Sequence, residues 1–280
     1  MKEDWTYVIK PKRGWFDIDL RELWHYRDLY LIYIKRKFIT VYKQTILGPL
    51  WFLIRPVFTM LMYTFVFGGL AGISTDGVPQ PLFYLSGIML WSYFSDSFTN
   101  TSNLFIENSG LFGKVYFPRL IIPLAQITSN LLKMGISLVI FVALYVWYLL
   151  DGAPLSINWT LCLFPFLLLL LALHAFSWGL IVASITTKYR DLKILLDFGM
   201  QIFMYVTPIV YPISAMPEKY RTFIELNPLT SILETFRYGC MGCGALDRGG
   251  LIYSTVFLLV ILLFSLLLFN RVERNVMDTV

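Results

Sequence analysis

The chain is poor in charged residues. Only 15% of its 280 residues are Asp, Glu, Lys or Arg, whereas 57% are hydrophobic. A soluble domain of this length carries about 25% charged residues. The sequence instead contains several apolar runs of about 20 residues, which match a hydrocarbon core of ~30 Å. The composition therefore excludes an ordinary soluble domain and predicts an all-α integral membrane protein.

Cysteine and histidine are scarce as well. The three cysteines, Cys162, Cys240 and Cys243, are too few for a disulfide framework. The CxxC spacing of the last two has no second pair and no neighbouring histidine, so no metal site is expected. Packed thiols are the simpler interpretation, and an occasional disulfide is the alternative. His174 stands alone in an apolar run, where it is expected to make an interhelical hydrogen bond, although a lone intramembrane histidine can also be functional.

Sequence motifs of nucleotide and metal enzymes are missing. The chain has no GxxxxGK[ST] phosphate loop, no GxGxxG fingerprint and no HExxH pair. We therefore expect a non-enzyme that hydrolyses no ATP itself and carries no cofactor of its own. Asp96 and Asp197 are the acids expected well inside spans, and neither has an evident partner that would make it a catalytic dyad. So few buried ionisable groups also disfavour transport driven by an ion gradient.

Hydropathy predicts six membrane spans, and the first should remain in the mature protein because no signal peptide precedes it. The spans are expected at about 50–71, 82–104, 120–150, 158–186, 193–213 and 250–270. Residues 50–270 would thus form the transmembrane domain, 1–49 an N-terminal segment and 271–280 a tail. Lysine and arginine concentrate in the N-terminal segment, the tail and the loops after the second and fourth spans. The positive-inside rule then predicts that both termini are cytoplasmic.

Two further elements are expected outside the spans. The segment from Leu20 to about Lys37 mixes Leu, Trp and Tyr with charged residues, which predicts an amphipathic helix in the cytoplasmic interface. The alternative is a helix packed on a soluble partner. Between the fifth and sixth spans, Met216-Pro217-Glu218 and Asn227-Pro228 resemble helix starts. They predict two short outer helices, the second ending at Gly242 or Gly244.

Aromatic residues are abundant, at 17% of the chain. Within the predicted spans, helical spacing places many of them on shared faces with polar residues. Such faces suit sugars, whose apolar C–H surface stacks on an aromatic ring. Ordinary helix packing is the competing interpretation. The candidates for a pathway lining are Trp51, Phe58, Phe65, Tyr84, Trp91, Phe98, Tyr205 and Tyr211.

Several segments carry a resemblance to a known family. They are YKQTILGPLW (42–51), GKVYFPR (113–119), YRD (189–191), NPLT (227–230) and ETFR (234–237). Together with the six-span order, they resemble the membrane subunit of ABC-2 type exporters of cell-surface polysaccharides, above all O-antigen exporters. The resemblance extends from about residue 20 to 270. Teichoic acid exporter permeases are close relatives.

The resemblance implies a homodimer in a bacterial inner membrane, with two copies of a separate ATPase that bind ATP and Mg. The cargo would be a polysaccharide on a polyprenyl diphosphate lipid, moved from cytoplasm to periplasm, and the other contacts would be membrane lipids rather than nucleic acid. The ATPase-coupling loop implied in this way contains Glu107, Phe112, Lys114 and Tyr116. The outer helices would be periplasmic gate helices, with candidate residues Asn227, Glu234 and Arg237. For Arg237, a surface or intrahelix ion pair with Glu234, three residues before it, is the plainer alternative.

Arg55 has two interpretations. It lies about one turn inside the first predicted span, near enough to the cytoplasmic face for its side chain to reach the headgroups. Alternatively, it binds the diphosphate of the lipid-linked substrate, because a guanidinium fork fits phosphate oxygens. The family commonly has an uncharged polar residue at this position.

Other functions remain as alternatives. An ABC-2 exporter of drugs or small lipids would share the fold and differ in its pathway. An integral-membrane transferase of envelope synthesis would need converging acid, base or metal residues at one membrane face. The sequence does not show such a group.

Overall fold

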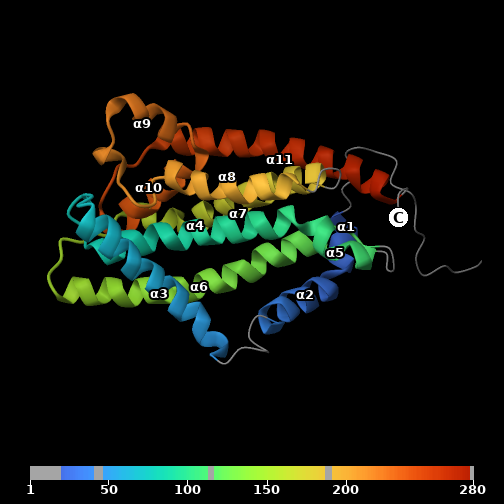
Figure 1. Cartoon of the computed structure of the whole chain (residues 1–280), viewed down its shortest axis with the longest axis horizontal. Helices are drawn as coiled ribbons and strands as arrows, with labels where there is room; N and C mark the ends of the chain where they lie inside the picture. The colour runs from blue at the N-terminus through green and yellow to red at the C-terminus, as the bar shows by residue number, and fades with distance from the viewer. Residues whose placement is uncertain (1–19, 41–46, 113–116, 187–190, 278–280) are drawn as a thin grey trace, which may run out of the picture.

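The computed structural model describes residues 20–40, 47–112, 117–186 and 191–277. Within these ranges the regular structure is entirely helical. Six helices form the long bundle, α3 among them because a π-helical segment extends it to Leu70, and further helices lie at both ends (Figure 1). The long helices are α3 (Trp51–Tyr63), α4 (Gln80–Ser102), α6 (Ile121–Leu150), α7 (Phe164–Thr186), α8 (Leu192–Val206) and α11 (Arg248–Met277).

Four of the six expected spans are confirmed as helices long and apolar enough to cross a membrane. They are Trp51–Leu70, Ile121–Leu150, Trp159–Thr186 and Arg248–Val272. The first includes a π-helical segment, η2 (Thr64–Leu70), and the third begins with the 3₁₀ segment η3 (Trp159–Leu163). In η2, Gly68 lies against the side chain of Gln80, where a Cβ atom would collide. The end of this span therefore lies close to the start of α4.

The other two expected spans form helices at the predicted positions. That these two helices cross the membrane remains a prediction. α4 has the length, but its serines, Asn100 and Asp96 make it less apolar. It packs against α3, α6 and α7, so little of it has to match lipid. α8 is apolar but only 15 residues long. It ends at Val206 because Pro208 disfavours helical backbone in Thr207, which is extended.

The N-terminal segment folds as two helices, where one was expected. α1 (Leu20–His25) and α2 (Arg27–Thr40) are separated at Tyr26. α2 packs along α6, and the Tyr30 hydroxyl lies 2.6 Å from Thr128 Oγ1. Trp24 is exposed, as the interface prediction requires, whereas Tyr33 contacts the core near Phe117.

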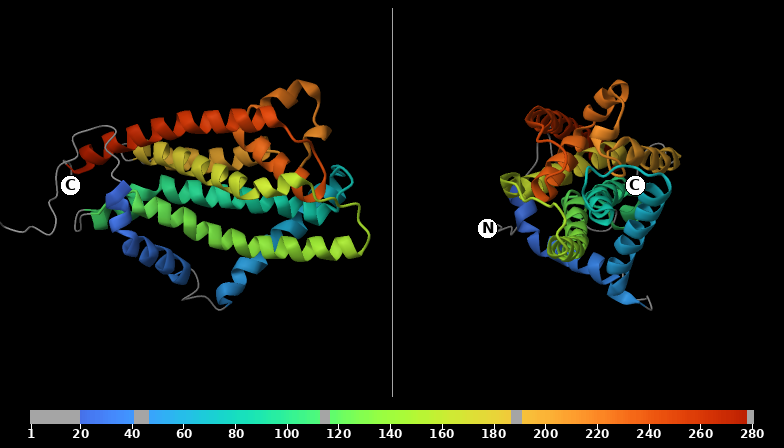
Figure 2. Two further views of the ribbon diagram at one scale, coloured as in Figure 1. Left: turned by 180° about the vertical axis from the view of Figure 1, so that it is seen from behind. Right: turned by 90° about the vertical axis from the view of Figure 1, so that its left-hand side faces the viewer.

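Different sets of short helices lie at the two ends of the bundle. α1, α2, α5 (Leu104–Phe112) and the C-terminal end of α11 share one end (Figure 2). At the opposite end lie η4 (Ile213–Ala215), α9 (Glu218–Glu225) and α10 (Pro228–Met241). Both predicted outer helices are therefore present. Asn227 caps α10 by accepting a hydrogen bond from the Leu229 amide, and Gly242, with a φ of 73°, ends it.

Candidate functional site

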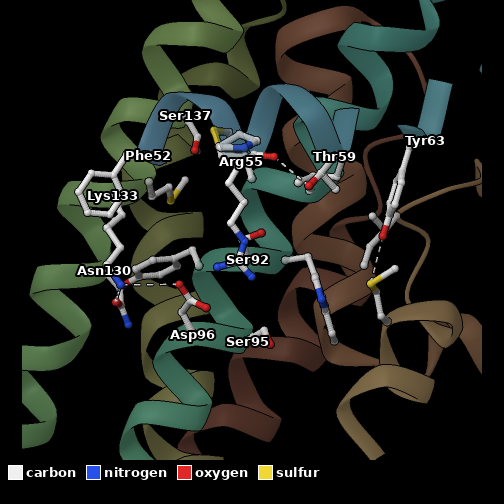
Figure 3. Close-up of a pocket in the computed structure, with 18 of the residues that line it drawn as sticks. Phe52, Arg55, Thr59, Tyr63, Ser92, Ser95, Asp96, Asn130, Lys133 and Ser137 are labelled. Atoms are coloured by element: carbon white, nitrogen blue, oxygen red, sulfur yellow. Dashed lines mark hydrogen bonds and ion pairs between the residues drawn. The ribbon is translucent and has the colours of Figure 1, made fainter. Parts of the chain in front are cut away.

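A cavity of about 400 Å³ lies between α3, α4, α6 and α8. Residues at four-residue intervals on α3, from Trp51 through Arg55 and Thr59 to Tyr63, form one wall, because this spacing keeps side chains on one helix face. α8 and the turn after it add Met204 and Ile209. The polar part of the lining comes mostly from α4 and α6 and comprises Ser92, Ser95, Asp96, Asn130, Lys133 and Ser137 (Figure 3).

Two of the charged side chains in this cavity, Asp96 and Lys133, form a pair that was not predicted from the sequence. Lys133 Nζ lies 3.8 Å from Asp96 Oδ2 and donates a 3.0 Å hydrogen bond to Asn130 Oδ1. Asn130 in turn donates to Ser97 Oγ at 3.2 Å. Asp96 therefore has an ion-pair partner on another helix, which the sequence alone did not reveal. The signal was a lysine inside a long apolar run, since an ionisable residue in a span is a candidate functional residue.

Arg55 enters the cavity from α3 and points toward Ser92 and Asp96 (Figure 3). It remains solvent-accessible within the single chain. Three charged side chains from three helices thus line one cavity, and two of them are cations. The three side chains together carry a net charge of +1.

The eight predicted pathway aromatics separate into three groups. Trp51 and Trp91 line the cavity. Tyr84, Phe98 and Tyr211 are buried in helix packing, and the Tyr211 hydroxyl donates to the Tyr205 carbonyl at 2.9 Å. The remaining three lie exposed on the faces of α3, η2 and α8, at Phe58, Phe65 and Tyr205. A single chain therefore does not gather them into one lining, and their pathway role stays a prediction.

The expected coupling residues are only partly described. Glu107 is exposed on α5, and Phe112 ends this helix. The centres of the Phe112 and Phe117 rings lie 5.8 Å apart, and the guanidinium carbon of Arg119 lies 5.0 Å from the centre of the Phe112 ring. Arg119 itself is buried. Lys114 and Tyr116 lie outside the described residues.

The expected gate residues join α10 to the bundle. Arg237 is only 1% exposed. Its guanidinium donates to the carbonyl oxygens of Pro208 at 2.6 Å and Ile209 at 2.8 Å, just beyond α8. The ion pair with Glu234 exists at 3.5 Å. This confirms the intrahelix ion pair between residues three apart, but both side chains are buried, so the pair does not lie on the surface.

Glu234 and Asn227 complete this outer junction. Burial raises the pKa of the Glu234 carboxyl, and the neighbouring Arg237 opposes that shift. Glu234 also lines a second cavity of about 350 Å³ with Asp76, Arg221 and Asp247. The Asn227 amide donates to Thr207 Oγ1 at 2.9 Å, which ties the start of α10 to the end of α8.

The cysteines and His174 have structural surroundings. All three thiols are free, with Cys162 exposed and Cys240 and Cys243 buried. Among the described residues, no cluster of metal-ligating side chains occurs. His174 Nε2 lies 3.1 Å from Ser254 Oγ, which confirms the interhelical hydrogen bond between α7 and α11.

The sequence matches proteins that transport polysaccharides. It is 27% identical to "O-antigen export system permease protein RfbA" of Klebsiella pneumoniae over 248 residues, covering 88% of this chain and 92% of the relative. A protein of the same name from Myxococcus xanthus is 26% identical, with 78% and 82% covered. "Polysialic acid transport protein KpsM" of Escherichia coli is also 26% identical, with 83% and 89% covered.

The family comparison covers most of the helical bundle. The model of the ABC-2 type transporter family matches residues 28–241, from α2 to the end of α10. This range includes the cavity and the outer helices. The chain belongs to the ABC-2 type transporter family of membrane proteins.

Proposed function

We propose that this chain is the permease subunit of an ATP-driven exporter, which moves a lipid-linked polysaccharide from the cytoplasm to the periplasm. The cargo would be O-antigen on a polyprenyl diphosphate. The observation that carries the proposal is the cavity between α3, α4, α6 and α8, where two tryptophans meet hydroxyl, amide and charged side chains. Aromatic faces suit sugar rings, and the cations suit a phosphate.

Energy would come from another protein. The sequence contains no phosphate loop, so ATP and Mg would be bound by a separate ATPase, present in two copies. The segment from Glu107 to Tyr116 would dock on it. Its described part, α5, lies at the end of the bundle shared by α1 and the end of α11 (Figure 1). We assign this end to the cytoplasm, with both termini there, six spans in the inner membrane, and α9 and α10 as the periplasmic gate.

A homodimer would complete the pathway. The outer faces of α3 and α8 expose large apolar side chains, among them Phe58 and Leu61 on α3 and Phe198 and Tyr205 on α8. These faces must abut lipid or a second copy of the chain. If the two copies meet near them, Phe58, Phe65 and Tyr205 face the space between the copies. Arg55 of each copy would meet the diphosphate as the cargo enters.

The test is export in cells that lack this chain. Cells complemented with wild type should place polysaccharide on their surface, and cells with the empty vector should accumulate it on the cytoplasmic lipid carrier. The purified chain should have no ATPase activity, whereas its complex with the ATPase should hydrolyse ATP. ATP hydrolysis by the chain alone, or export without it, would overturn the proposal.

Another polysaccharide is the second candidate cargo. The similarity to the polysialic acid transport protein, over 83% of this chain, favours this alternative over a drug or small lipid. Analysis of the glycan that accumulates in the deletion strain distinguishes O-antigen from a capsular polymer.

A further inference from the structure

Lys133 lies deep within α6. It is twelve residues from the first residue of this 30-residue helix, or about 18 Å along the axis. Its side chain is 22% exposed and faces the cavity rather than the outer surface of the bundle. A cation at this depth is costly unless it is paired or faces water. Its position therefore requires an explanation beyond helix packing.

The anionic partner of Lys133 is weakly placed. The 3.8 Å distance to Asp96 is long for a charge-assisted hydrogen bond, which is usually 2.7–2.9 Å. The nearer oxygen belongs to the neutral Asn130. Asp96 is 41% exposed, so its carboxylate has room to turn toward water. The Asp96 carboxylate and the Lys133 ammonium can therefore separate without a change in the helix packing.

Positive charge exceeds negative charge around this lysine. Arg55 lines the same cavity, so Arg55 and Lys133 share it with a single carboxylate, that of Asp96. One carboxylate therefore faces more than one cation. A doubly charged anion between Arg55 and Lys133 would relieve this imbalance, and Asp96 would then be the group displaced.

We propose that Lys133 is a second phosphate ligand beside Arg55, and that Asp96 pairs with Lys133 while the site is empty. The ligand class is a phosphate carried on a lipid. Because the inference rests on the proposed function, the source we infer is the diphosphate of the lipid-linked cargo. On binding, the phosphate replaces the Asp96 carboxylate as the partner of Lys133, and Asn130 continues to orient the ammonium.

This exchange predicts opposite effects for the two members of the pair. Lys133→Met removes a ligand and should weaken binding about tenfold or more, the usual worth of a charge-assisted contact. Asp96→Asn removes the competitor and should strengthen binding severalfold. In a purely structural pair, both changes would weaken folding and neither would tighten binding. The sign of the Asp96→Asn effect therefore separates the two roles.

The experiment measures binding of undecaprenyl diphosphate to the purified full-length chain in nanodiscs. Undecaprenol and phosphatidylglycerol serve as comparison ligands, because the first lacks phosphate and the second carries one on a different lipid. Lys133→Arg should retain most of the affinity. Lys219→Met is the matched control, since it removes the same charge from exposed α9.

The outcomes separate this inference from the proposed function. If wild type prefers the diphosphate and Arg55→Gln weakens binding while Lys133→Met does not, the role of Lys133 is refuted and the proposed cargo stands. If wild type binds the diphosphate no better than undecaprenol, the proposed cargo itself fails. If phosphatidylglycerol binds equally well and with the same dependence on Lys133, the site holds membrane phospholipid and the inference is overturned.

A measurement on wild type covers the case in which a variant does not fold. Undecaprenyl diphosphate should protect Lys133 from acetylation, as read by peptide mass spectrometry, and undecaprenol should not. Lys219 should be acetylated equally in both samples. Equal acetylation of Lys133 with both ligands would refute the inference.

Discussion

The guanidinium carbon of Arg237 lies 3.8 Å from the centre of the Phe83 ring, so a cation of α10 stacks on an aromatic side chain of α4. The same guanidinium donates to the carbonyl oxygens of Pro208 and Ile209. One buried side chain thus connects α10, α4 and the turn after α8. If α10 moves relative to α4 and the turn after α8, the contacts of Arg237 must break. If they stay intact, these elements must move together with α10.

Replacing Arg237 with methionine should therefore destabilise the chain strongly. Two buried carbonyls would lose their donor and Glu234 would lose its counter-charge, which together cost about 3 kcal/mol or more. Unfolding by SDS in mixed micelles measures the change. Arg221→Met is the control, because the Arg221–Glu225 pair is exposed and such pairs contribute about 1 kcal/mol or less. Equal stability of the two variants would contradict the role assigned to Arg237.

Gly179 allows α7 to approach α4 closely. A Cβ atom there would meet Thr101 Cβ and the Phe98 carbonyl oxygen. Gly179→Ala should consequently cost about 1–3 kcal/mol through overpacking. At Gly135 on α6, no heavy atom lies within 4 Å of the added Cβ. Gly135→Ala should instead stabilise the helix by about 0.5–1 kcal/mol, and paired SDS unfolding curves test the difference in sign.

The buried thiols should be unreactive in the folded chain. Burial raises the pKa of Cys240 to about 12 and that of Cys243 to about 11, so almost no thiolate is present near pH 8. Cys162 is exposed. Iodoacetamide should therefore label Cys162 first, and the Cys162→Ser variant should become labelled only after unfolding. Rapid labelling of native Cys162→Ser at pH 8 would show that the α10 region opens readily.

The exposed aromatics offer the cleaner test of a sugar pathway. Trp91 and Phe98 are buried, so their replacement by alanine would cost about 3–5 kcal/mol of stability. A loss of export in such a variant could then result from misfolding rather than from a lost sugar contact. Phe58 and Tyr205 are 63% and 56% exposed. Phe58→Ala and Tyr205→Ala should keep the fold and reduce export severalfold, since each ring contact is worth about 0.5–1.5 kcal/mol.

The matched control for this test is Trp147→Ala on α6, where the side chain is 70% exposed and carries no proposed role. Surface polysaccharide is measured at equal membrane levels of each variant. Export that is equal in all three variants would argue that the aromatics face lipid.

Much of the helical layout follows from local signals. Asn227, Pro228 and Gly242 mark the ends of α10 through capping and backbone geometry, which depend on a few neighbouring residues. The apolar runs of the four confirmed spans are likewise local. The break at Tyr26 and the early end of α8 were not anticipated, because helix ends respond to small differences that hydropathy windows average away.

The sequence by itself determined that this is a helical membrane protein, where most of its helices lie, and that it lacks a phosphate loop for ATP. Only the tertiary structure decided which charges from different helices meet. Asp96 and Lys133 come from different helices, as do Arg237 and its carbonyl partners beyond α8. Such pairs depend on which helices become neighbours and how each is rotated about its axis. Packing of the whole chain sets both, and no short stretch of sequence encodes them.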